Sequence, residues 1–177
     1  DFVSEIPEQL NLYGRSMWVR LNSPDLHSAS FTLREIDDIS FWRKRNDLPS
    51  VNSTITRRRK EKLARAISSL LKSEGRGQQC SVETMERGEV KYVFVYPDDF
   101  VRCDQVHDNA GNLIPHPVRP TMQIVFAYHH IEGSLAMFAR LPKASKEELE
   151  RLFADCILGW ELPPYDLQQT YRLEHLK

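Results

Sequence analysis

The side chains best suited to chemistry in this chain are basic, and they are concentrated in one segment. Between Arg43 and Arg76 there are 11 of the 24 lysines and arginines but only three acidic residues, which gives a net charge of +8. The rest of the chain carries 13 basic and 22 acidic residues, a net charge of −9. The total of −1 therefore hides a strong asymmetry, and a segment this basic indicates an anionic partner.

The segment contains a predicted helix that begins near Ser53 and ends near Lys72, with Gly75 just beyond it. Apolar residues fall on one face of this helix at 3.6-residue spacing, and its opposite face is basic. Phosphates are held by charge and by the bidentate geometry of guanidinium groups. If the basic helix over 54–72 binds nucleic acid, the residues predicted to contact phosphates are Arg43, Arg45, Arg57, Arg58, Lys62 and Arg65.

The basic helix also has a feature that local folding does not favour. Arg57, Arg58 and Arg59 lie at the positive end of the helix dipole, where each costs ~0.3–1 kcal/mol unless an anion or solvent offsets it. The same charges fit a solvated helix face, or a face docked on acidic segments of the same protein. Of the aromatic residues only Trp42 is near, which argues against a platform that stacks single-stranded bases.

Histidine, cysteine and aspartate are the residue types that bind zinc, and several of them occur in the C-terminal half. They are Cys103, Asp104, His107, His116, His129 and His130. Alternation along a strand places Cys103 and Asp104 on opposite faces, and it separates His129 from His130 in the same way. No two-ligand spacing repeats, so we expect water-exposed loop histidines and no metal site.

The remaining candidates for catalysis are weaker. Asp98 and Asp99 could act as acid and base, but Pro-Asp-Asp between two strands is also ordinary turn chemistry. There is no phosphate-binding glycine loop, dinucleotide fingerprint or Gly-x-Ser-x-Gly elbow. The sequence therefore predicts no cofactor, and a small hydrolase built on the Asp and His residues of the sheet loops remains only an alternative.

Length and composition place the chain among ordinary globular proteins. The 177 residues suit one domain, and the three cysteines at wide spacing indicate reduced thiols in a cytoplasmic protein. No apolar run approaches the ~20 residues that span a bilayer, so no membrane partner is expected. The chain starts without methionine and stops within an apolar rhythm, which indicates a domain of a longer protein.

The N-terminal third is predicted to contain one strand and two helices. Met17 to Leu21 is rich in strand formers. A first helix is expected from Thr32, which forms a capping box with Glu35, and Pro49 ends that segment. The basic helix follows.

From residue 78 the pattern becomes that of a consecutive antiparallel sheet. Strands are expected at 79–85, 92–96, 100–106, 122–128 and 134–140, with the prolines between 115 and 120 in an irregular or edge connection. Tyr92 to Tyr96 is apolar on both faces, which predicts an interior strand. A last helix begins at the capping residue Ser145, and its stripe includes Leu152 and Phe153 as residues expected to be nearly fully buried.

Together these elements predict an α+β fold with a mainly antiparallel sheet of four to six strands and helices packed on one face. We expect a single domain over 1–177, with a helical part at 24–75, the sheet at 78–140, a helix at 145–159 and a surface tail at 160–177. The leading functional hypothesis is a non-catalytic binding or regulatory domain whose partner is another protein or the remainder of the same polypeptide. The alternative is a nucleic-acid-binding module that uses the basic helix.

Overall fold

The computed structural model describes residues 2–163, and the predicted tail falls mostly outside them. The chain divides into two compact units with the boundary between Phe41 and Trp42. The N-terminal unit is helical, with a short 3-10 turn at Phe2–Glu5, α1 at Leu12–Asn22 and α2 at Pro24–Asp37.

Two predictions for the N-terminal unit are wrong. Met17 to Leu21 lies in α1 and not in a strand, because Asn11 caps the helix: its side-chain oxygen accepts from the Gly14 N–H at 2.8 Å. Helix α2 begins at Pro24, and Thr32 lies in its interior, where its hydroxyl donates to the Ser28 carbonyl. Pro24 is the sequence signal for this start, because proline is favoured at the first position of a helix. The prediction from Thr32 and Glu35 overlooked it.

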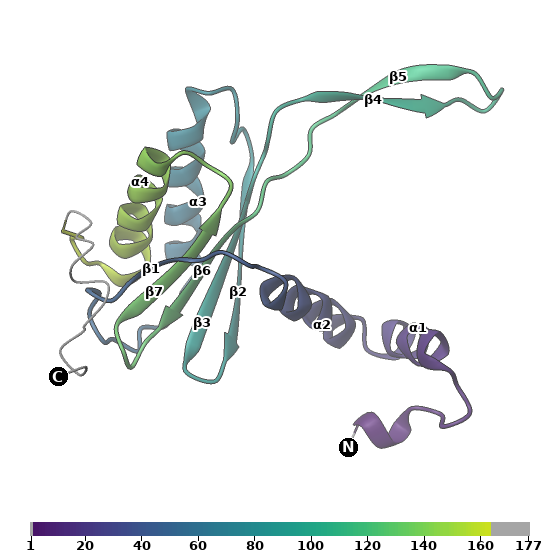
Figure 1. Cartoon of the computed structure of the whole chain (residues 1–177), viewed down its shortest axis with the longest axis horizontal. Helices are drawn as coiled ribbons and strands as arrows, with labels where there is room; N and C mark the ends of the chain where they lie inside the picture. Colours follow the sequence, from purple (N-terminus) through teal and green to yellow (C-terminus); the bar gives the residue numbers. More distant parts are fainter. Residues whose placement is uncertain (1, 164–177) are drawn as a thin grey trace. The chain divides into compact units, whose positions relative to one another are not determined.

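The C-terminal unit contains a five-stranded antiparallel sheet with the strand order β1-β7-β6-β3-β2, together with a separate two-stranded ribbon of β4 and β5 (Figure 1). The strands are β1 Arg43–Arg45, β2 Cys80–Arg87, β3 Val90–Pro97, β4 Arg102–His107, β5 Leu113–Val118, β6 Ile124–His129 and β7 Ser134–Ala139. The predicted α+β class and antiparallel sheet are confirmed.

Strand β3 is interior, as predicted, because it pairs with β2 on one side and with β6 on the other. Its apolar character on both faces matches its environment: Val93 and Val95 lie in the main core, and Phe94, on the opposite face, is also buried. Strand β1 was not predicted, since three successive basic residues are not a strand pattern, and neither was β5.

Helices α3 (Arg57–Lys72) and α4 (Lys143–Phe153) cover one face of the sheet (Figure 1). Leu63, Ile67 and Leu71 of α3 are fully buried at helical spacing, and Phe153 of α4 stacks on Phe126 of β6 with ring centroids 4.8 Å apart. Leu152 is only half-buried, so the burial predicted for it is wrong.

The starts of both helices differ from prediction, whereas α3 ends at Lys72 as predicted. Helix α3 begins at Arg57 and not near Ser53, because Thr56 supplies its cap. Helix α4 begins at Lys143, ahead of Ser145, and continues into one π-helical turn, η2, at Ala154–Leu158. Within the described residues, every helix is too short or too polar to cross a lipid bilayer.

Candidate functional site

The chain that leads into α3 is fixed to the sheet at three points. The Leu48 N–H donates to the Gly133 carbonyl at 3.1 Å, and the buried Tyr128 hydroxyl accepts from the Val51 N–H at 3.1 Å. Lys91, which is also buried, donates from Nζ to the Ser53 carbonyl at 2.8 Å. A side chain at Gly133 would collide with the Leu48 carbonyl, and its φ of +65° favours glycine as well. These contacts set where α3 begins.

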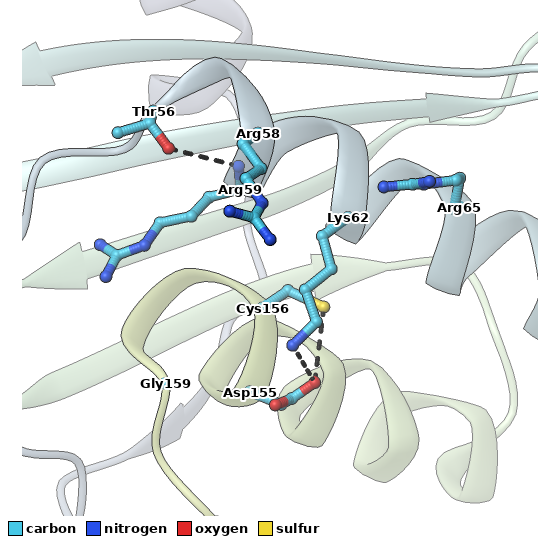
Figure 2. Close-up of a pocket in the computed structure, with 8 residues that line it drawn as sticks. All are labelled: Thr56, Arg58, Arg59, Lys62, Arg65, Asp155, Cys156 and Gly159. Carbon is cyan, nitrogen blue, oxygen red and sulfur yellow. Dashed lines mark hydrogen bonds and ion pairs between the residues drawn. The ribbon is translucent and has the colours of Figure 1, made fainter.

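Beside the first turns of α3 the protein has a pocket of about 430 Å³ (Figure 2). The N-cap residue Thr56 lies at one side, and its hydroxyl oxygen accepts from the Arg59 N–H at 3.4 Å. Among residues 2–163, four basic side chains and one carboxylate line the pocket, so the described lining is strongly positive. The lining residues are Thr56, Arg58, Arg59, Lys62, Arg65, Asp155, Cys156 and Gly159.

The three arginines of the pocket have no carboxylate partner within the described residues. Arg59 donates from Nη1 to the Thr54 carbonyl at 3.0 Å, and Arg65 donates from Nε to the Glu61 carbonyl at 3.2 Å. In the described part of the chain the side chain of Arg58 makes no hydrogen bond or ion pair, and Figure 2 shows its guanidinium group at the pocket. Guanidinium groups that line one pocket without carboxylate partners can donate charge-assisted hydrogen bonds to an anion.

Lys62 is the pocket cation that does have an acidic partner. Its Nζ lies 2.8 Å from Asp155 Oδ2, and this hydrogen bond raises the pKa of the lysine. Both side chains are more than half exposed, so the pair is weak and a stronger anion can replace the carboxylate. Asp155 and Cys156 reach the pocket because they lie in the π-helical turn η2, which ends at Gly159 in a left-handed conformation.

Burial raises the pKa of the Cys156 thiol, and this effect is larger than the opposing influence of the nearby Lys62 ammonium. The thiol is therefore protonated near neutral pH and is not an activated nucleophile. Its contact with Asp155, at 3.8 Å from Sγ to Oδ2, further favours the protonated form.

Arg43 and Arg45, both predicted phosphate contacts, lie in a different place. They extend from β1 toward α4, where the buried carboxylate of Glu150 accepts from Arg43 Nε at 2.6 Å and from Arg45 Nη1 at 3.2 Å. Asp47 also accepts from Arg45 Nε at 2.6 Å. Burial by itself would lower the pKa of Arg45, but the two carboxylates raise it above its usual value. These arginines join β1 to α4, and neither lines the pocket.

The other predicted contacts lie on the solvent side of α3. Arg58, Lys62 and Arg65 all line the pocket, whereas Arg57 is not among its described lining residues and pairs with Glu61 at 2.8 Å. Lys72 continues the same exposed face at the far end of the helix. Arg58, Lys62, Arg65 and Lys72 recur every three, four or seven residues, so they form a basic stripe that is about 21 Å long at 1.5 Å per residue.

The acidic, histidine and cysteine candidates do not gather around the pocket. Asp104 and His116 are cross-strand neighbours on the β4–β5 ribbon, whereas His129 lies at the end of β6, beside Glu89 at 3.4 Å. Over residues 2–163 the structure holds no group of three or more His, Cys, Asp or Glu side chains that could hold a metal ion. Asp98 directly follows β3 and is bridge-paired with Thr121, and its Oδ2 accepts from the Gln79 N–H at 3.0 Å.

Five of the residues that line the pocket were not predicted from the sequence: Thr56, Arg59, Asp155, Cys156 and Gly159. Arg59 shares the angular position of the apolar face of α3, so the helical spacing did not group it with the basic residues of the opposite face. Thr56 could have been found as a capping residue directly before a basic run. Asp155, Cys156 and Gly159 come from a separate helix, and no sequence signal places that helix against the start of α3. No family model, curated protein or solved structure matches this chain, so its function is inferred from the geometry of this site.

Proposed function

We propose that this chain is a non-catalytic binding domain that binds nucleic acid through the basic pocket and the exposed basic stripe of α3. Arg58, Arg59 and Arg65 contact phosphate oxygens in this proposal, and Lys62 exchanges its contact with Asp155 for a phosphate. The N-terminus of α3 adds the positive end of its dipole and its free backbone N–H groups.

One observation carries the proposal: three arginines line a single pocket beside the first turns of α3, and no described carboxylate neutralises them. A face docked on acidic segments of the same protein would show such carboxylates. The described part of the chain supplies only Asp155 to the pocket, and Glu61 pairs with Arg57 outside it.

The length of the stripe favours a polyanion over a single phosphate group. Its four exposed cations extend about 21 Å along α3, whereas duplex DNA carries one charge per ~1.7 Å of its axis. An extended phosphate backbone can therefore contact the pocket and the far end of the helix at the same time. None of the described residues that line the pocket is aromatic, so the expected contacts are to phosphate and carry little base information.

The experiment is an anisotropy titration of labelled duplex DNA, single-stranded DNA and RNA with the full chain at several salt concentrations. We expect binding that weakens steeply with salt. Arg58→Ala should lower the slope of log K against log salt by about one unit for duplex DNA, and it should weaken binding to different sequences equally.

Lys72→Ala is the matched control, because it removes the same charge from the same face of α3 but about 21 Å from Arg58. A smaller loss for Lys72→Ala than for Arg58→Ala is expected if the pocket is the centre of binding. Equal losses would show that only net charge matters. If none of the three nucleic acids binds at micromolar protein, the proposal fails, and the basic face is better assigned to an acidic protein surface.

A further inference from the structure

Strands β4 and β5 form a sheet of their own that extends away from the five-stranded sheet (Figure 1). They pair antiparallel from Arg102 with Val118 to His107 with Leu113. A two-stranded ribbon is only marginally stable in water by itself, because it buries little apolar surface. Most of its side chains are exposed, among them Leu113, which keeps 60% of its surface in contact with solvent. The ribbon therefore has the features of an arm that needs a partner.

Two prolines determine which edge of the ribbon is open. Pro115 and Pro117 have no N–H, so neither can form a hydrogen-bonded pair with β4. The backbone hydrogen bonds between the two strands therefore join the alternate pairs, such as Asp104 with His116 and Val106 with Ile114. The nitrogen atoms of both prolines then point to the outer edge of β5. That edge lacks two donors, and proline at such positions is a known way to prevent strand addition.

The outer edge of β4 is open by the same reasoning. The backbone N–H and C=O groups that point inward belong to Arg102, Asp104 and Val106, so those of Cys103, Gln105 and His107 point outward. Within the described residues no backbone group pairs with this edge. Strand β4 also contains no proline. An antiparallel strand could therefore hydrogen-bond along it.

We infer that β4 pairs antiparallel with β4 of a second copy of this chain, so that the two ribbons form one four-stranded sheet about a two-fold axis. An isologous contact of this kind must be self-complementary, and the charges of β4 decide its register. A centre at Asp104 would place two carboxylates opposite each other. Arg102 and Asp104 already pair within one chain, with Nε and Oδ1 3.2 Å apart, and a centre at Cys103 places Arg102 opposite Asp104 of the second copy, twice. The four side chains then form one cluster of opposite charges across the two strands, which is favourable.

A centre at Gln105 fits less well. It would oppose Arg102 to Asp108, which lies beyond the end of β4 and already accepts hydrogen bonds from Asn112 at 2.8 and 3.2 Å. The register centred on Cys103 also brings the exposed Val101 into the extended ladder, opposite Gln105. This inference is independent of nucleic-acid binding, because none of its residues belongs to the basic pocket.

Sedimentation equilibrium of the full chain and of two variants at Gln105 tests the open edge. Gln105→Pro removes an outward N–H of β4 without touching the ladder to β5, and Gln105→Ala removes the same side chain but keeps the N–H. We expect dimers for the wild type and for Gln105→Ala, and monomers for Gln105→Pro. A wild type that stays monomeric from micromolar to millimolar concentration overturns the inference, and so does a Gln105→Pro variant that dimerises as well as the wild type.

The register is tested without proline, in case Gln105→Pro fails to fold. Arg102→Asp and Asp104→Arg should each weaken the dimer by placing like charges opposite each other, and the double variant should restore it. A short bis-maleimide should also join two chains through Cys103, which is exposed, and Cys103→Ser should abolish the product. Failure of the double variant to restore dimerisation overturns the register centred on Cys103.

Discussion

Glu150→Gln tests whether one buried carboxylate joins α4 to β1. The side chain of Glu150 is 1% exposed, and it accepts from Arg43 at 2.6 Å and from Arg45 at 3.2 Å. Glutamine has nearly the same shape but no charge, and its NH₂ group cannot accept a hydrogen bond from a guanidinium group. The variant therefore leaves two largely buried arginines facing an amide in place of a carboxylate.

Removing one partner of a buried ion pair costs ~3–5 kcal/mol, because the other charge stays buried without compensation. Here the lower end of that range applies, since Arg45 keeps Asp47 at 2.6 Å and Arg43 keeps Glu147 at 3.4 Å. A loss of about 3 kcal/mol in the free energy of unfolding corresponds to a fall of roughly 6–12 °C in Tm for a chain of this size. Urea and thermal unfolding followed by circular dichroism measure both quantities.

Glu147→Gln is the matched control. Glu147 lies one turn earlier on α4 and also faces Arg43, but its side chain is 37% exposed. The expected loss is at most about 1 kcal/mol, as for other solvent-screened pairs. If both variants unfold at the same urea concentration, or if Glu150→Gln matches the wild type, then the buried network does not hold α4 in place and the reasoning is refuted.

Two further stability predictions follow from burial in the same core. Phe153→Ala should lower the free energy of unfolding by ~3–5 kcal/mol, because the ring is fully buried against Phe126. Leu152→Ala is the control and should cost clearly less, since Leu152 is half-buried. Equal losses for the two variants in urea unfolding would contradict this prediction. Burial, assisted by Asp98, raises the pKa of the Cys80 thiol to about 12 from an ordinary value of 9.0, so the folded chain holds its proton more tightly than the unfolded chain. Stability should therefore fall as the pH rises from about 9 toward about 12, and unfolding midpoints of Cys80→Ala measured across that range should fall less than those of the wild type.

Local periodicity was enough to predict the elements whose own residues carry the packing signal. Strand β3 is apolar on both faces and is interior, and the stripe of α4 predicts the full burial of Phe153. The parts that could not be predicted depend on residues distant in sequence. Strand β1 consists of Arg43, Lys44 and Arg45, and its pairing with β7 places two of these charges against Glu150, which is 105 residues or more away.

The same distinction applies to the candidate site. The 3.6-residue spacing of α3 predicted that Arg58, Lys62 and Arg65 lie on one solvent-facing side of the helix. In the structure all three line one pocket. The opposite wall comes from η2, and no feature of the sequence indicates that this π-helical turn lies beside the start of α3. Arg43 could not be separated from the phosphate candidates by composition alone, because only the fold shows that its partner is a buried carboxylate.

Arg57, Arg58 and Arg59 lie at the positive end of the α3 dipole, and relief of this repulsion can supply only a small part of the proposed free energy of binding. Three cations against the positive end of the helix dipole cost about 1–3 kcal/mol together, and the ion pair of Arg57 with Glu61 offsets only part of this. Relief of that cost by an anion would strengthen binding by at most a factor of roughly a hundred, since 1.4 kcal/mol corresponds to tenfold. The micromolar affinity that the proposed function requires corresponds to about 8 kcal/mol, so in that proposal most of the binding free energy comes from new phosphate contacts and from released counterions. Counterion release is the part that salt removes. The steep salt dependence expected for the pocket and the loss expected for Arg58→Ala are therefore two measurements of the same contribution.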